Sequence, residues 1–186
     1  MEQKQTIVLT GFMGSGKSAV GRMLARQLNR PFRDLDQVIE EGEKRSIAAI
    51  FRSEGETHFR KLEYAYLKDI LSMPALVVAL GGGALQQQNV MDLVKKKGIM
   101  AYLNVPEDTL FQRLADDRKR PLLRGERGEQ LNDRELRAKI HAMLIEREPL
   151  YRRADVTLDI APRWTIRDTT NELIKILTHH APAVFT

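Results

Sequence analysis

The feature that most constrains the fold is a glycine-rich motif between an apolar run and a helical pattern. The run Ile7–Leu9 ends just before Gly11, which opens the pattern G-x-x-x-x-G-K-S that closes at Ser18. Residues 19–28 then carry apolar side chains at helical spacing. A strand, a glycine loop and a helix in this order predict a phosphate site, because loop N–H groups and the helix N-terminus face one anion.

This phosphate loop (residues 11–18) predicts which groups bind a nucleoside triphosphate. The Lys17 ammonium reaches the β- and γ-phosphates, and the Ser18 hydroxyl ligates Mg²⁺. A glycine-rich turn that matches by chance is the alternative, but the flanking strand and helix argue against it. The residues predicted to bind ATP here are Gly14, Ser15, Gly16, Lys17, Ser18 and Ala19.

Composition limits the classes that need considering. The 186 residues suffice for one domain (1–186), with a core over about 5–180 and a frayed tail at 181–186. The chain has no cysteine, which excludes disulfides, thiolate metal sites and a cysteine nucleophile, and suits a cytoplasmic protein. No apolar run is long enough to span a membrane. The net charge of +5 fits an enzyme with anionic ligands, although it also fits a nucleic-acid binder.

Apolar runs and helical patterns alternate along the chain. This alternation predicts a three-layer α/β fold, with a five-stranded parallel sheet between helices and right-handed crossovers. The expected strands cover residues 7–9, 32–36, 75–80, 99–103 and 156–160. The expected helices cover residues 19–28, 37–41, 47–51, 56–71, 90–97, 106–114, 133–152 and 165–179, with a break at Gly55 and a kink at Pro149.

Two carboxylates, Asp34 and Asp36, end the second expected strand. Ligands of open parallel sheets gather at the carboxyl ends of strands, so we expect both acids beside the phosphate loop. The alternative is that Asp36 only caps the helix that follows. No acid ends the strand over 75–80, which makes Asp34 the candidate for the outer shell of the metal.

Two further segments suggest ligand contacts. Gly81, Gly82 and Gly83 follow an apolar strand, where they serve a tight turn, a packing need or a ligand laid against bare backbone. The basic segment over about 117–130 predicts a mobile lid that excludes water and brings a guanidinium to the γ-phosphate, with a solvated connector as the alternative. On pattern alone, Arg60 is only a solvated cation.

The chain as a whole resembles the shikimate kinases, from about Ile7 to the last helix. The phosphate loop is shared by a large superfamily, but the ordered set of six motifs is far more specific. Besides the loop, these motifs are Asp34-Leu35-Asp36, Phe59-Arg60, Gly81-Gly82-Gly83, Arg120-Pro121-Leu122-Leu123 and Arg147-Glu148-Pro149-Leu150-Tyr151.

The resemblance implies the nucleoside monophosphate kinase fold with sheet order 2-3-1-4-5, and transfer of the ATP γ-phosphoryl group to the 3-hydroxyl of shikimate. This is a step of aromatic amino acid biosynthesis. Substrate-binding helices would cover about 36–71. The implied roles are ring-hydroxyl binding and proton acceptance for Asp36, carboxylate binding for Arg60 and Arg147, backbone contacts for Gly81–Gly83, phosphate contact for Arg120, and adenine contacts for Arg113 and a residue near Arg163.

Two other classes explain part of the pattern. A gluconate or nucleoside monophosphate kinase would share the loop and the lid, but not the two arginines and the triple glycine on the acceptor side. A nucleotide switch or nucleic-acid-dependent ATPase would use the positive charge, yet the cations are scattered among acids without interleaved aromatic residues. We therefore expect a monomer that binds ATP, Mg²⁺ and shikimate, but neither nucleic acid nor membranes.

Overall fold

The computed structural model describes residues 6–115, 123, 125, 129–182 and 185. Arg120 and most of the predicted lid (117–130) lie outside these residues. Of the tail predicted to fray, Ala181 is buried and Phe185 packs against the core.

Five parallel strands form one sheet in the order β2-β3-β1-β4-β5, which confirms the expected topology. The central strand β1 pairs with β3 on one side and β4 on the other, so Val8 lies between Val78 and Met100. The strands are β1 (Thr6–Thr10), β2 (Phe32–Asp34), β3 (Val77–Ala79), β4 (Gly98–Asn104) and β5 (Val156–Asp159).

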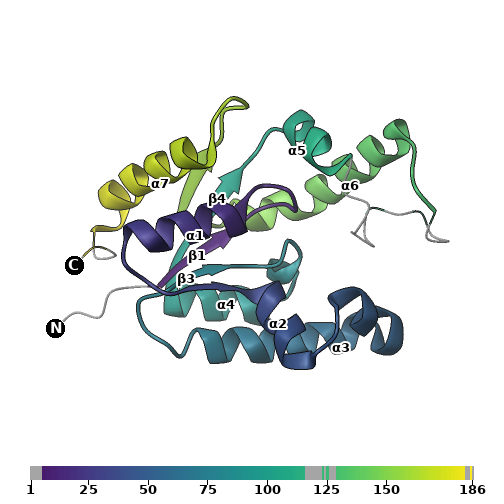
Figure 1. Cartoon of the computed structure of the whole chain (residues 1–186), viewed down its shortest axis with the longest axis horizontal. Coiled ribbons are helices and arrows are strands. Elements are labelled where there is room, and N and C mark those ends of the chain that lie inside the picture. The colour runs from purple at the N-terminus through teal and green to yellow at the C-terminus, as the bar shows by residue number, and fades with distance from the viewer. Residues whose placement is uncertain (1–5, 116–122, 124, 126–128, 183–184, 186) are drawn as a thin grey trace.

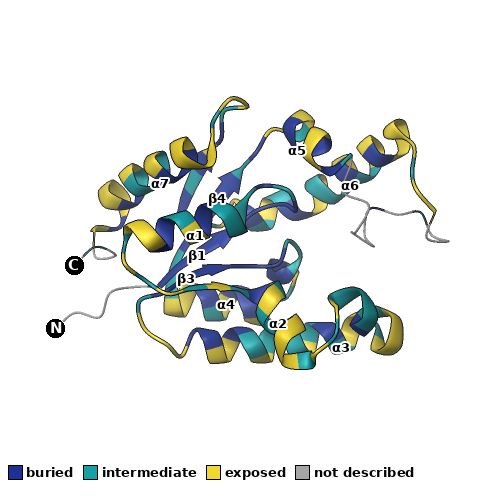
Figure 2. Cartoon of the chain, viewed as in Figure 1, coloured by how far each residue is buried: buried dark blue, intermediate teal, exposed yellow. Residues whose placement is uncertain are grey.

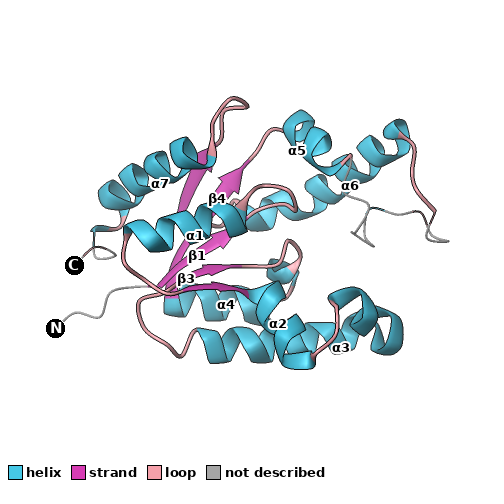
Figure 3. Ribbon diagram, viewed as in Figure 1, coloured by secondary structure: helices cyan, strands magenta, loops and turns pink. Residues whose placement is uncertain are grey.

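Helices cover both faces of the sheet (Figures 1 and 3). Helices α1 and α7 pack together on one face, and α3 and α4 lie on the other. Strand β1 begins and helix α7 ends on the side away from the carboxyl edge of the sheet, which leaves that edge for the loops (Figure 1). The helices are α1 (Lys17–Gln27), α2 (Leu35–Glu43), α3 (Ile47–Ile70), α4 (Gln88–Lys97), α5 (Glu107–Leu114), α6 (Asp133–Tyr151) and α7 (Ile166–His180), with a short 3₁₀ helix η1 (Ala84–Gln86).

The core lies between the sheet and these helices. Every residue of β1 and β3 is buried, as expected for central parallel strands covered on both faces (Figure 2). The helices bury the side that faces the sheet and expose the other (Figure 2). This packing holds the carboxyl ends of β1 and β3 rigidly beside each other, and both lead into loops of the site.

The region around Asp34 differs from the sequence prediction. Strand β2 ends at Asp34, and α2 begins at Leu35, two residues earlier than expected. The extended backbone of Asp34 and its carboxylate, which accepts a hydrogen bond from the Gln37 N–H at 3.4 Å, make Asp34 the N-cap. The alternative that Asp36 caps this helix is therefore wrong, and Asp36 lies in the first turn.

The long helix α3 contains the expected break. Gly55 has φ 79° and ψ 176°, so two helical segments meet there. Ser46 caps the first segment by accepting from the Ala49 N–H at 3.2 Å. The second segment carries the Phe59-Arg60 motif toward the carboxyl edge of the sheet.

Helix α6 does not bury all of its apolar side chains. Met143, Leu144 and Leu150 are only partly buried. The helix passes through Pro149 and ends at Tyr151. Its fully buried residues are Leu136, Ile140, Arg147 and Tyr151. The buried face of α6 thus changes from apolar to polar where the helix approaches the site.

Candidate active site

The phosphate loop lies at the carboxyl end of β1, and hydrogen bonds join its end to its beginning. Gly16 has a left-handed φ of 93° and is the N-cap of α1, with no side chain bonded to the first turn. The Lys17 ammonium donates to the carbonyls of Gly11 and Phe12, both at 2.9 Å. Because no side chain caps α1, its first N–H groups and its positive dipole end are available to an anion.

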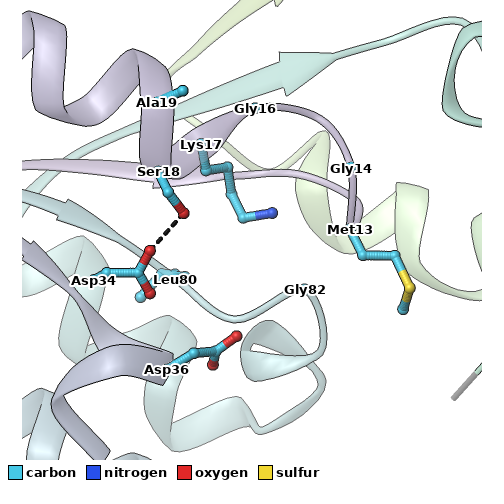
Figure 4. Close-up of a pocket in the computed structure, with 10 residues that line it drawn as sticks. All are labelled: Met13, Gly14, Gly16, Lys17, Ser18, Ala19, Asp34, Asp36, Leu80 and Gly82. Atoms are coloured by element: carbon cyan, nitrogen blue, oxygen red, sulfur yellow. Dashed lines mark hydrogen bonds between the residues drawn. The ribbon is translucent and has the colours of Figure 1, made fainter. Parts of the chain in front are cut away.

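A cavity of about 420 Å³ opens beside this loop (Figure 4). The Lys17 side chain points into it from the start of α1, and Asp36 faces it from α2 (Figure 4). The lining residues are Met13, Gly14, Gly16, Lys17, Ser18, Ala19, Asp34, Asp36, Leu80 and Gly82. A phosphate-binding wall thus lies next to a wall that carries a carboxylate.

Ser18 and Asp34 form an oxygen pair at the edge of this cavity. The Ser18 hydroxyl donates to the Asp34 carboxylate at 2.5 Å (Figure 4). Mg²⁺ takes oxygen ligands and is held in nucleotide sites by one or two protein groups together with phosphates. The chemistry and position of the two oxygens therefore fit this ion.

Close approach by neighbouring groups explains the three consecutive glycines (Gly81–Gly83, the glycine turn). A β-carbon at Gly81 would lie 2.7 Å from Asp36 Oδ1, and one at Gly83 would lie 2.8 Å from Arg60 Nη2. At Gly82 it would lie 3.3 Å from the Met13 backbone nitrogen. None of the three has a left-handed φ, so space and not backbone conformation requires glycine here.

Arg60 is held by acids and is not the solvated cation that its local pattern suggests. Its Nη1 donates to Glu63 Oε2 at 2.7 Å, and its Nη2 donates to Glu56 Oε1 at 3.0 Å. Burial lowers the pKa of Arg60, but the two carboxylates outweigh it, so the net pKa is raised. The guanidinium therefore remains charged at the glycine turn.

Glu63 is a site residue that the sequence analysis missed. It is 1% exposed and also accepts a hydrogen bond from Gln87 Nε2 at 2.9 Å. Burial raises the pKa of its carboxyl, Arg60 opposes this shift, and Asp36 adds to it. One signal was available, because Glu63 lies on the buried face of α3 between Phe59 and Leu67, where the four-residue spacing predicts an apolar side chain.

Arg147 and Tyr151 reach the glycine turn from α6. Arg147 Nη1 donates to the Gly82 carbonyl at 3.5 Å, and the Tyr151 hydroxyl donates to the same carbonyl. Arg147 is 6% exposed, and its Nε has no hydrogen-bond partner among the described residues. Burial raises the pKa of Tyr151 well above its ordinary value, so the hydroxyl keeps its proton.

A second cavity, of about 280 Å³, lies on the other side of the phosphate loop. Arg113 borders it and donates from Nη1 to the Gly14 carbonyl at 3.0 Å. Trp164 also lines it, whereas its neighbour Arg163 is exposed and does not. An apolar ring and a guanidinium next to a phosphate loop suit a flat nucleobase.

The structure brings together most of the predicted residues. Lys17, Ser18, Asp34 and Asp36 share the main cavity with Gly82, while Arg60 and Arg147 meet the turn on either side of it. In the part of the chain that the structure describes, no helix has both the length and the apolar composition needed to cross a membrane.

Comparisons with known proteins identify the family of the chain. A family model described as "Shikimate kinase" matches residues 13–178. A shikimate kinase of Chlorobium phaeobacteroides is 41% identical over 97% of this chain and 94% of its own, and one of Salinibacter ruber is 44% identical over 94% and 85%. The structure of shikimate kinase from Acinetobacter baumannii in complex with shikimate superposes with a TM-score of 0.87, at 36% identity over 97% of this chain and 96% of that one. On this evidence the chain belongs to the shikimate kinase family, and it is an ATP-dependent kinase.

Proposed function

We propose that the enzyme transfers the γ-phosphoryl group of ATP to the 3-hydroxyl of shikimate in the cavity between the phosphate loop and the glycine turn. One observation supports this placement above all. Five groups from α2, α3 and α6 converge on three consecutive glycines: Asp36, Glu63, Arg60, Arg147 and Tyr151. Glu63 is paired with Arg60, and the two cations together with the Asp36 carboxylate suit a small hydroxylated acid.

On the nucleotide side, residues 14–19 bind the ATP phosphates through backbone N–H groups, and Lys17 neutralises charge on the transferring group. Arg113 and Trp164 hold the adenine in the second cavity. Arg120 stays a prediction: it contacts the γ-phosphate from the segment 117–130. With little covalent chemistry required of the protein, positioning and charge stabilisation account for most of the catalysis.

On the acceptor side, Arg60 and Arg147 bind the carboxylate of shikimate from two helices. A guanidinium meets a carboxylate through two parallel charge-assisted hydrogen bonds, which fixes the orientation of the ring. Asp36 accepts hydrogen bonds from the ring hydroxyls and takes the proton of the attacking one. Backbone groups of Gly81–Gly83 contact the ring where no side chain intervenes.

Ser18 and Asp34 are the groups that would hold Mg²⁺, Ser18 directly and Asp34 in the outer shell. When bound, the ion neutralises the β- and γ-phosphate charge that develops during transfer. The short Ser18–Asp34 contact already places the hydroxyl oxygen toward the cavity (Figure 4).

The activity is tested by measuring ADP release at saturating Mg·ATP with shikimate, gluconate or AMP as acceptor. We expect release to depend on shikimate alone, and release with gluconate or AMP instead would refute the proposal. Replacing Arg60 or Arg147 with alanine should raise KM for shikimate far more than KM for ATP. Arg45→Ala is the matched control. Arg45 is also ion-paired with a glutamate, Glu54, at 2.8 Å, but it is not one of the groups that converge on the glycine turn.

For the assembly, we propose a single kinase domain over residues 1–186 that acts as a monomer in the cytoplasm, without nucleic acid. Support for the exclusion of nucleic acid comes from the sequence, in which the cations are scattered among acids. Light scattering after size exclusion should give a mass near 21.3 kDa. Salt-sensitive binding to a random oligonucleotide would contradict the exclusion of nucleic acid.

A further inference from the structure

Tyr151 has a buried hydroxyl to which the proposed function assigns no role. It is 1% exposed at the end of α6, one helical turn after Arg147. Its hydroxyl is oriented toward the Gly82 carbonyl, although an apolar residue would fill the same space without a polar group to satisfy. A buried hydroxyl aimed at the backbone of a ligand site suggests a role in positioning.

The hydroxyl shares its acceptor with the Arg147 guanidinium. It donates its proton to the Gly82 carbonyl. Arg147 Nη1 donates to the same carbonyl at 3.5 Å, so two side chains one turn apart on α6 converge on one backbone oxygen. A carbonyl oxygen has two lone pairs, and this arrangement uses both.

The ring of Tyr151 is itself fixed against the sheet. Its centroid lies 5.3 Å from that of Tyr102 on β4, with the ring planes tilted by 35°. Tyr102 is 2% exposed, and its own hydroxyl donates to Asn104 Oδ1 at 3.0 Å, away from the glycine turn. The Tyr151 hydroxyl is therefore anchored to the rigid centre of the fold and not to α6 alone.

We propose that Tyr151 is a positioning residue for the acceptor: its hydroxyl ties α6 to the glycine turn and holds Arg147 in register with Gly82. This inference rests on the proposed role of Arg147 in binding the substrate carboxylate. Without the hydroxyl, the guanidinium keeps its charge, but α6 loses one of the two hydrogen bonds that hold this end of the helix at the glycine turn. Carboxylate binding weakens, while the reacting hydroxyl at Asp36 and the nucleotide are unaffected.

The test is the steady-state kinetics of Tyr151→Phe, with Tyr102→Phe as the matched control. Each variant removes one buried hydroxyl from the same stacked pair, but only one of these hydroxyls faces the site. We expect Tyr151→Phe to raise KM for shikimate about tenfold, in the range of one lost buried hydrogen bond, with kcat and KM for ATP within about twofold. Tyr102→Phe should leave all three constants unchanged.

A second measurement separates positioning from stability. KM does not depend on the fraction of enzyme that is folded, so a variant that is merely unstable loses total activity at constant KM. In the Arg147→Ala background, Tyr151→Phe should add little to KM for shikimate, because it acts through the guanidinium. An unchanged KM in the single variant, or strictly additive effects in the pair, would overturn the inference. Absence of shikimate-dependent ADP release by the wild-type enzyme would instead overturn the proposed function.

Discussion

Replacing Gly81 with alanine adds one methyl group at the point where Asp36 approaches the glycine turn. The added β-carbon would lie 2.7 Å from Asp36 Oδ1, whereas ordinary van der Waals contact begins at 3.4 Å. The backbone of Gly81 has no left-handed φ, so alanine fits the chain itself. The strain therefore falls mainly on the Asp36 carboxylate, which must move by the difference of about 0.7 Å to escape contact, and to a smaller extent on Glu63 Oε1 at 3.1 Å.

The magnitude follows from the cost of misplacing a reacting group. A displacement of about 1 Å costs roughly 10²-fold in rate, so a shift of about 0.7 Å corresponds to about 20- to 30-fold, or about 2 kcal/mol. We expect this loss in kcat for shikimate phosphorylation, because Asp36 contacts the attacking hydroxyl. Stability should change little, because the displaced atoms are the end of a side chain.

The assay is ADP release with shikimate and ATP varied in turn, together with the thermal midpoint of each variant. Gly83→Ala is the contrast, since its β-carbon would lie 2.8 Å from Arg60 Nη2 and would disturb carboxylate binding. This variant should raise KM for shikimate and largely spare kcat. A Gly81→Ala enzyme with kcat within about twofold of wild type would refute the role of Asp36 in the reacting geometry.

Three further predictions address other parts of the site. Asp34→Asn should raise the Mg²⁺ concentration needed for half-maximal activity. Its thermal midpoint should not change, because asparagine caps α2 as well as aspartate does. Asp34→Ala should have the same effect on Mg²⁺ and should also cost about 1 kcal/mol of unfolding free energy in urea titrations. Glu63→Gln should raise KM for shikimate about fivefold by weakening the charge-assisted bond to Arg60. Because burial raises the pKa of Glu63 above its ordinary 4.5, wild-type stability should fall as the pH rises above this value, and the variant should lose that slope. Burial raises the pKa of Tyr102 from 10.0 to about 12, so folded Tyr102 keeps a proton that the unfolded chain releases above pH 10. The wild-type protein should therefore lose about 1 to 2 kcal/mol of unfolding free energy between pH 9 and pH 11, measured by urea unfolding, that Tyr102→Phe does not lose. An equal loss in both proteins would contradict the burial argument.

The sequence predicted the architecture well because its signals are local and periodic. The buried runs at β1 and β3, the phosphate loop and the break at Gly55 each depend on a few adjacent residues. The boundary between β2 and α2 was predicted poorly. An aspartate at this position can end a strand, cap a helix or bind a metal, and the sequence does not distinguish these roles. Only the extended backbone and the bond from the Gln37 N–H decide in favour of the cap.

Site residues were predictable where a motif names them and not where contacts between helices define them. Glu63 and Tyr151 are buried on helix faces, although the sequence analysis assigned neither of them to the core. Their polar atoms have meaning only because the fold places Arg60 and Gly82 beside them. Arg60 and Glu63 are three residues apart on one helix, which is a spacing that a local pattern can record. Gly82 and Tyr151 are 69 positions apart, and no local pattern joins them.

The most direct test is a crystal structure with shikimate and Mg·ADP bound. We predict that the substrate carboxylate lies within hydrogen-bonding distance of Arg60 and Arg147, and that a ring hydroxyl contacts Asp36 on the side that faces Lys17. Shikimate bound away from the glycine turn, or with its carboxylate toward the phosphate loop, would contradict it.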